Sequence, residues 1–459
     1  MNGLGALLTT LIALGVICGG RGLATTSFVA AVMYLPQQQS LDIGGLTITA
    51  LRMIEVFGFL RICLRGETRG LSLNRIDKAF FATYTYAGIV FLLRSSVAQA
   101  ETVGWACDTM LCYLIFRSLI RSDEDFRGLL RSMAVLMVPY VVLLTIEMAT
   151  GTNPFSALGT WTSWVELREG RVRAMGSFRN PSLLGTFGAC FLPLYVALFR
   201  EKSGQRYAVL GARCCAYIVY AANSGGPISA MGAGLLGCLL WRLRRHMRLF
   251  RITAALTLVV LGMVMEAPVW SLLERMSFIT GGSGWHRAHL ITMAWQDFDK
   301  WWPVGMPLSQ TTQWFPYTLG ITGTADITNA FVDFGLKAGL AAIAIFVYLL
   351  SAGFGAIGRS IPAVHVDDRS AAHSCMLWGL GCALAAHVVT WFGITYFDQT
   401  FVWWVIDIAA VSSLTSPRRA ALAQAAGGPD AIVAMPDTGP HRAAETPRLA
   451  APHSSEVPL

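Results

Sequence analysis

Residues 328–353 read TNAFVDFGLKAGLAAIAIFVYLLSAG, and this stretch decides the fold. From residue 338 to residue 353 it contains no charged side chain. A helix needs about 20 mostly apolar residues to cross a bilayer, with roughly 17 as the lower limit. The stretch therefore predicts a transmembrane helix.

Apolar runs of similar length recur along the whole chain. Of its 459 residues, 54% are hydrophobic and 14% are charged, whereas about 25% of the residues of a soluble domain are charged. A soluble fold of this size cannot bury so much apolar surface. We therefore predict an all-α, polytopic integral membrane bundle of about twelve transmembrane helices. The other predicted spans lie near residues 44–63, 79–96, 101–120, 129–149, 182–199, 207–222, 226–241, 250–268, 374–393 and 400–415.

The N-terminal apolar stretch, residues 3–35, is interrupted by Gly19, Gly20 and Arg21. It forms either two short helices or one kinked helix, so the total is twelve or thirteen spans. The stretch has no basic leader and no cleavage site, which favours a retained helix over a signal peptide.

Lysine and arginine are distributed unevenly between the connections. They concentrate in loops 61–78, 117–131, 200–213, 242–251 and 354–371, and are absent from the connections 36–46, 97–100, 223–225 and 394–399. Because basic loops stay in the cytoplasm, segments 150–181 and 269–327 are predicted to be periplasmic, the second as a large loop. The same distribution argues against a nucleic-acid partner despite the net charge of +8.

The chain divides into a membrane domain, residues 1–415, and a tail, residues 416–459. The tail is rich in Pro, Ala and Gly without a periodic apolar face, so we predict that it is disordered and cytoplasmic. The ten cysteines lie in or beside apolar runs and form no CxxC pair. This is typical of small buried hydrophobic residues.

Four arginines lie in the first periplasmic segment, where the positive-inside rule disfavours them: Arg168, Arg171, Arg173 and Arg179. One interpretation is an anion site, because arginine forks match phosphate oxygens. The alternative is pairing with Glu166 and Glu169, or with lipid phosphates. Arg173 is the strongest candidate because it is closest to the next predicted helix.

The second periplasmic segment contains a predicted helix from Gly284 to Phe298. Arg287 lies in its first turn, where a cation opposes the helix dipole unless an anion shares the site. The adjacent His286 is a candidate acid or base, or a packing residue. Trp285 could stack on a sugar ring, although tryptophan also populates the membrane–water interface.

The residues Asp326-Ile327-Thr328-Asn329 stand directly before the apolar run quoted first. Asp, Thr and Asn all favour the N-cap of a helix. Asp326 is also a candidate general base that faces a bound substrate. The two interpretations are compatible, because one residue can cap the helix while another reacts.

Several charged residues lie within predicted spans. Arg52 and Glu55 are i,i+3 neighbours and Asp333 and Lys337 are i,i+4 neighbours, so each pair can neutralise itself. For these four and for Asp108 and His387, which have no local partner, we favour structural pairing between helices. No Walker loop and no metal cluster is recognisable, and we expect neither a cofactor nor a metal.

Four segments together resemble the O-antigen ligase/polymerase superfamily of bacterial inner-membrane glycosyltransferases. They are RAMGSFRNPSLLGTFGACFLPL at 173–194, SGGPISAMGAGLLGCLLW at 224–241, GGSGWHRAHL at 281–290 followed by WWPVG at 301–305, and DITNAFVDFGLKAGL at 326–340. Their order and spacing cover residues 44–415 and look closest to the exopolysaccharide-associated members.

The resemblance implies a metal-independent enzyme that uses a polyprenyl-diphosphate-linked glycan. It implies that Arg173 and Arg287 hold the diphosphate. Asn329 and Gly339 fit the spacing of a ligase motif, but Thr328 stands where ligases carry His, which leaves Asp326 as the nearest base. Further substrate contacts are expected from Arg171, Arg179, His286, Thr328, Asn329 and Trp285.

We therefore expect a polymerase that joins repeat units of an exopolysaccharide or O-antigen at the periplasmic face. Its expected partners are the lipid-linked oligosaccharide, membrane lipids and other polysaccharide-assembly proteins. One alternative is a ligase that transfers finished glycan to a lipid or protein acceptor. Another is a transporter of lipid-linked glycans that performs no chemistry.

Overall fold

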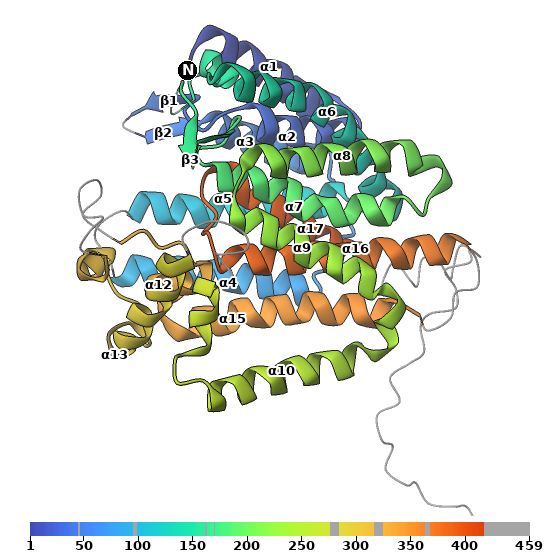
Figure 1. Cartoon of the computed structure of the whole chain (residues 1–459). Coiled ribbons are helices and arrows are strands. Elements are labelled where there is room, and N and C mark those ends of the chain that lie inside the picture. Colours follow the sequence, from blue (N-terminus) through green and yellow to red (C-terminus); the bar gives the residue numbers. More distant parts are fainter. Residues whose placement is uncertain are drawn as a thin grey trace, which may run out of the picture.

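The computed structural model describes residues 1–44, 46–94, 99–160, 163–168, 170–275, 284–315, 325–362 and 368–416. In this part of the chain the fold is a bundle of helices (Figure 1), which confirms the predicted all-α class. β-Structure is limited there to two short hairpins and one isolated bridge. The prediction for the tail, residues 416–459, lies outside the described residues except at Ser416.

The longer helices are α1 (Gly3–Cys18), α2 (Arg21–Tyr34), α3 (Ala50–Leu64), α4 (Arg75–Arg94), α5 (Gln99–Leu119), α6 (Asp123–Thr150), α7 (Pro181–Leu198), α8 (Gln205–Ala222), α9 (Gly225–Leu239), α10 (Met247–Val264), α12 (Gly284–Gln296), α15 (Ala330–Ser360), α16 (Asp368–Trp391) and α17 (Phe401–Leu414). The shorter ones are α13 (Phe298–Trp301), η1 (Pro154–Leu158), η2 (Lys202–Gly204), η3 (Leu240–His246), η4 (Val269–Ser271), η5 (Leu308–Trp314) and η6 (Asp398–Thr400). The strands β1 (Ser40–Ile43) and β2 (Leu46–Thr49) form one antiparallel hairpin, and β3 (Glu166–Arg168) and β4 (Arg171–Arg173) form the other.

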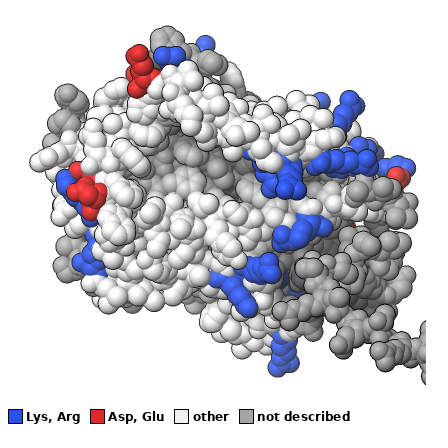
Figure 2. Space-filling model, turned by 90° about the horizontal axis from the view of Figure 1, so that it is seen from below, with Lys and Arg blue, Asp and Glu red and all other residues white. Residues whose placement is uncertain are grey.

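Six helical segments of the described chain are long and apolar enough to cross a membrane, so the chain is a membrane protein. They are Arg75–Arg94, Asp123–Thr150, Pro181–Leu198, Gly225–Val264, Ala330–Ser360 and Ser370–Trp391. Figure 2 shows a broad uncharged surface between the two ends of the bundle, with most of the visible Lys and Arg side chains gathered toward one end. This is the pattern expected of a surface that contacts lipid.

In the N-terminal region the structure shows whether residues 3–35 form one helix or two, and it changes the start of the next predicted span. The break at Gly19 and Gly20 separates two helices, α1 and α2. The span predicted at 44–63 begins too early, because residues 40–49 form the β1–β2 hairpin. Thr49 then caps α3 by accepting a hydrogen bond from the Arg52 amide at 3.3 Å, which sets the start of the helix at Ala50.

The helix α17 forms the centre of the bundle. All of its residues are buried, and it packs against α5, α15 and α16. The rings of Trp403 and Phe187 from α7 stack with centroids 4.4 Å apart. The central position means that every polar group of α17 must find its partner inside the protein.

The helix α15 is broken where the turn after Trp301 inserts into it. The Met306 amide donates to the Leu336 carbonyl at 2.9 Å, and the Leu340 amide donates to the Trp302 carbonyl at 2.8 Å. These bonds satisfy groups that the break at Gly339, with φ +79°, releases from the helix. The predicted WWPVG and DITNAFVDFGLKAGL segments therefore interlock.

Glycine is required on both sides of this junction. A Cβ atom at Gly339 would lie 2.6 Å from the Pro303 carbonyl oxygen, and one at Gly305 would lie 2.2 Å from the Leu336 carbonyl oxygen. Both glycines also have positive φ, which side chains disfavour. The close approach holds α13 and the preceding α12 against the N-terminal end of α15.

The helix α10 stands apart from the other long helices (Figure 1). None of its residues is buried, although it is apolar on all faces. A helix can satisfy its own backbone in lipid without a neighbour. Its C-terminal end leads to η4, where Trp270 Nε1 donates to Thr292 of α12 at 2.9 Å.

The charged residues within helices pair as expected, with one exception. Lys337 and Asp333 lie 2.7 Å apart on α15, and His387 reaches Asp407 of α17 at 3.2 Å. The exception is the possible i,i+3 pair of Arg52 with Glu55, which does not form, so that the favoured pairing between helices is confirmed for Arg52.

Helix–helix packing explains the exception. Arg52 instead bonds to Asp108 of α5 at 2.9 Å. Glu55 is fully buried and accepts from the Cys112 thiol of the same helix at 3.3 Å. Both side chains of α3 therefore take their partners from α5, against which α3 packs.

Candidate functional site

The turn between α8 and α9 forms one wall of the candidate site. Arg173, at the end of β4, donates from Nε to the Ala222 carbonyl of this turn at 3.4 Å. The hydroxyls of Ser182 and Ser224 lie 2.7 Å apart. Because Ser182 is in the first turn of α7 and Ser224 is the N-cap of α9, the N-terminal ends of the two helices lie side by side.

Arg287 approaches the same turn from α12. Its guanidinium lies against two backbone glycines: a Cβ at Gly393 would be 3.0 Å from Cζ, and one at Gly226 would be 3.5 Å from Nη2. The buried Nε atom has no hydrogen-bond partner among the described residues. The predicted place of Arg287 in the first turn of α12 is confirmed. A buried donor without a partner is costly, and an anion at this position would satisfy the Nε–H group.

Three arginines share the electrostatic field around this turn. Burial lowers the pKa of Arg287, and the charge of Arg168 lowers it further. Burial likewise lowers the pKa of Arg173, where Arg168 adds to the effect and Glu166 opposes it. We call Arg168, Arg173 and Arg287 the arginine cluster. Two adjacent helix N-termini and three guanidinium groups make this wall strongly attractive to a phosphate group.

Arg173 also confirms part of the alternative interpretation, because it forms an ion pair with Glu166 across the β3–β4 hairpin. Glu169 lies outside the described residues. The cluster therefore contains three cations and pairs with one carboxylate, so the Glu166–Arg173 ion pair leaves the cluster with a net positive charge.

His286 lies in the same helical turn as Arg287, but its side chain contacts a different set of residues. Its Nδ1 lies 3.4 Å from the Thr328 hydroxyl, and its ring stacks on Phe315 with centroids 4.1 Å apart. Burial lowers the pKa of His286, the charges of Arg287 and His289 add to this, and Asp326 opposes it. A neutral imidazole can accept or donate a proton at neutral pH.

The structure decides which residue of the 326–329 segment caps α15. The Asn329 side chain accepts from the amides of Phe331 and Val332 at 3.0 and 3.2 Å. The Asp326 carboxylate is exposed and makes no hydrogen bond or ion pair to another described residue. Asp326 is thus available to a substrate, and Asn329 has a structural role.

The remaining predicted site residues lie around these groups. Trp285 is 49% exposed and stacks on His289 with centroids 5.2 Å apart, so its outer face is open to a ligand. Arg171 is exposed at the start of β4. Arg179 forms an ion pair with Asp398 at 3.3 Å, which gives it a structural role.

Four residues contribute to the site in a way that no local sequence pattern indicates. The sequence marks Arg168 only as one of four arginines, and no local pattern indicates its electrostatic effect on Arg287. Gly226 and Gly393 lie in different helical regions, and no local signal marks them as neighbours of one guanidinium. Phe315 likewise carries no pattern that would place it on His286.

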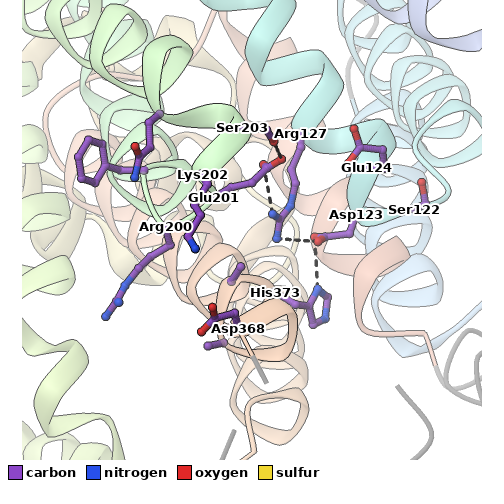
Figure 3. A pocket seen from close by; sticks show the side chains of 14 residues that line it. Ser122, Asp123, Glu124, Arg127, Arg200, Glu201, Lys202, Ser203, Asp368 and His373 are labelled. Atoms are coloured by element: carbon purple, nitrogen blue, oxygen red, sulfur yellow. Dashed lines mark hydrogen bonds and ion pairs between the residues drawn. The ribbon is translucent and has the colours of Figure 1, made fainter. Parts of the chain in front are cut away.

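A cavity of about 940 Å³ lies at the opposite end of the bundle (Figure 3). It is separated from the arginine cluster by the length of α7, about 27 Å for its 18 residues. Arg127 bridges Asp123 at 2.7 Å and Glu201 at 3.2 Å, and His373 lies 3.2 Å from Asp123. The mixed charges of this lining do not select for an anion.

No three His, Cys, Asp or Glu side chains of the described residues converge in a way that could hold a metal ion. The comparisons with models of known protein families and with curated proteins give no match. The chemistry of the site must therefore be argued from its residues.

Proposed function

We propose that the protein is an inner-membrane glycosyltransferase that polymerises polyprenyl-diphosphate-linked repeat units of an exopolysaccharide or O-antigen. The observation that carries the proposal is the Nε atom of the half-buried Arg287, which is buried and has no hydrogen-bond partner among the described residues. It lies beside Arg168 and Arg173 and the N-terminal ends of two helices, and a diphosphate provides the charges that such a wall lacks.

The reaction uses both sides of the first turn of α12. The diphosphate of the donor lies on the arginine cluster, and the acceptor sugar hydroxyl lies near Asp326. The hydroxyl oxygen attacks the anomeric carbon and its proton passes to the Asp326 carboxylate. The bond from that carbon to the diphosphate breaks, and its electron pair stays on the diphosphate oxygen. The arginines stabilise the charge that develops there.

His286 and the aromatic residues support this reaction. A neutral imidazole near Asp326 can hydrogen-bond to the substrate hydroxyl without adding a competing positive charge. The open face of Trp285 provides a surface on which a sugar ring can stack.

The proposal includes a membrane topology of thirteen spans, in which α1 and α2 count separately. With the arginine-rich loops in the cytoplasm, the arginine cluster and Asp326 face the periplasm. A donor made on a polyprenyl lipid carries its diphosphate at the membrane surface, which matches a site at the outer ends of α7 and α9.

Two alternative functions use the same architecture, and one of them has a specific observation in its favour. A ligase would use the same arginine cluster but a different acceptor, and Thr328 in the ligase His position speaks against it. A transporter would need an opening toward the other side of the membrane, and the cavity beside Arg127 lies at that end.

A single reconstitution separates the three functions. The purified protein is placed in liposomes with a polyprenyl-diphosphate-linked oligosaccharide on the side of Asp326. Products of two, three or more repeat units on the lipid support the polymerase. Transfer only to an added lipid or protein acceptor supports the ligase, and movement of intact substrate across the bilayer without a new bond supports the transporter.

A further inference from the structure

The central helix α17 and the η6 turn before it carry a row of polar atoms without partners. They are Gln399 Oε1, Thr400 Oγ1, Trp403 Nε1 and Asp407 Oδ1, and none has a hydrogen-bond partner among the described residues. All four residues are at most 1% exposed. Residues 400, 403 and 407 recur at helical spacing, so they share one face of the helix.

It is energetically unfavourable to leave these four buried polar groups without hydrogen bonds. Each buried, unsatisfied donor or acceptor costs about 1–3 kcal/mol, and buried polar groups in native proteins are normally satisfied by protein or ordered water. Residues three and four apart on a helix are separated by about 4.5 and 6 Å along its axis. One bridging water spans such a gap, since each of its hydrogen bonds is about 2.8 Å long.

The two ends of this row contact other polar groups. At the outer end, Gln399 donates to the Ser177 carbonyl at 3.0 Å, and the neighbouring Asp398 pairs with the half-exposed Arg179. At the inner end, Asp407 contacts His387 through its other carboxylate oxygen.

His387 makes further polar contacts with residues outside α17. Its Nδ1 lies 2.6 Å from the Tyr396 hydroxyl and 3.4 Å from the Cys190 sulfur. A cavity of about 30 Å³ lies beside Tyr396, where α17 contributes Phe401 and Trp404 rather than the residues of the row, and it is lined also by Asp333 and Thr395. A cavity of this size with several polar partners can hold a water molecule.

We propose that a file of ordered water molecules occupies the polar face of α17 and connects the outer surface near Arg179 and Asp398 with the buried His387–Asp407 pair. Water is the ligand of this site, and through it the pair exchanges protons with the outer surface. The inference rests on the packing of α17 and is independent of the proposed glycosyl transfer.

Radiolytic labelling of the full-length protein in detergent tests the water file. Hydroxyl radicals generated from a bound water oxidise the side chain beside it, even when that side chain is buried. Trp403 should be oxidised faster than Trp314, which is 2% exposed and donates its indole N–H to Asp297 at 2.7 Å. Equal, slow labelling of the two tryptophans would overturn the proposal.

An isosteric variant tests the same point through stability. Thr400→Val removes one orphaned hydroxyl without changing the side-chain volume. If water bonds to this hydroxyl, the variant unfolds at a lower temperature and loses part of the Trp403 label. If the helix face is dry, the variant is unchanged or more stable and the label does not respond, which also contradicts the proposal.

A matched control shows what Thr→Val does where no water is involved. Thr186 is equally buried, and its hydroxyl donates to the Ser182 carbonyl at 2.8 Å. Thr186→Val should leave the Trp403 label intact. Loss of the label in both variants would mean that it reports general loosening of the bundle, and the water file would then be rejected.

Discussion

The Nδ1 atom of His286 lies 3.4 Å from the Oγ1 atom of Thr328. These residues belong to different predicted segments, the GGSGWHRAHL helix and the DITN segment. Their contact places an imidazole next to Thr328, the residue that the proposed resemblance aligns with the histidine of ligases. It also brings the candidate base Asp326 near His286, while the Arg287 guanidinium lies against Gly226 and Gly393.

Arg287→Ala should abolish polymer formation at normal protein levels. A hydrogen bond to a charged group contributes about 1.5–3 kcal/mol, or roughly a 10- to 150-fold change in affinity. Arg287→Lys should recover only part of the activity, because a point charge cannot fork two oxygens. The measurement is the chain length of the polysaccharide formed.

The exposed Arg171 provides the control for charge loss in the same region. Arg171→Ala should reduce polymer formation less than Arg287→Ala does. A fully active Arg287→Ala protein would rule out a diphosphate on this guanidinium.

Asp326→Asn should stop polymerisation while the protein remains folded. The substitution removes proton acceptance and retains side-chain size, and α15 keeps its cap because Asn329 supplies it. The experiment compares product formation with the thermal unfolding temperature of the same preparation. Normal-length polymer from the variant would leave the arginine cluster as the whole catalytic apparatus.

The lowered pKa of His286 predicts a pH-dependent stability. Because burial depresses this pKa below its usual value of 6.5, the folded protein binds fewer protons than the unfolded chain just below pH 6.5. Stability should therefore fall as the pH drops through this region. In His286→Gln the loss of melting temperature between about pH 7 and pH 5 should be smaller.

The exposed His246 of η3 supplies the reference for this experiment. His246→Gln should keep the pH dependence of the wild type. An unchanged pH dependence in His286→Gln would show that other groups dominate the acid response.

Gly339→Ala should destabilise the junction between α15 and the WWPVG turn. The new methyl group would meet the Pro303 carbonyl at 2.6 Å in a backbone conformation with φ +79°. Such strain costs about 1–3 kcal/mol. Gly232→Ala is the matched control, because a Cβ there has nothing within 4 Å. Equal melting temperatures of the two variants would contradict the tight junction.

The proposed orientation predicts which side chains a membrane-impermeant thiol reagent can reach. In a background without native cysteines, Gln310→Cys should be labelled from outside the inner membrane and Pro440→Cys should not. The reverse result would place the arginine cluster in the cytoplasm and exclude the proposed donor.

The sequence by itself determined the membrane class, the approximate position of each helix and the place of Arg287 in a first helical turn. Hydropathy and helix periodicity are local properties, so they can be read within about 20 residues. The interruption at Gly19 and Gly20 was visible for the same reason.

Only the tertiary structure decided which of these elements meet. The contacts of Arg287 with Gly226 and Gly393, and of Arg52 with Asp108, join segments more than 50 residues apart. They depend on the packing of whole helices, which no local pattern encodes. The break in α15 was hidden for a related reason. Gly339 reads as an ordinary helical residue until the Pro303 carbonyl of another segment occupies the space where its side chain would be.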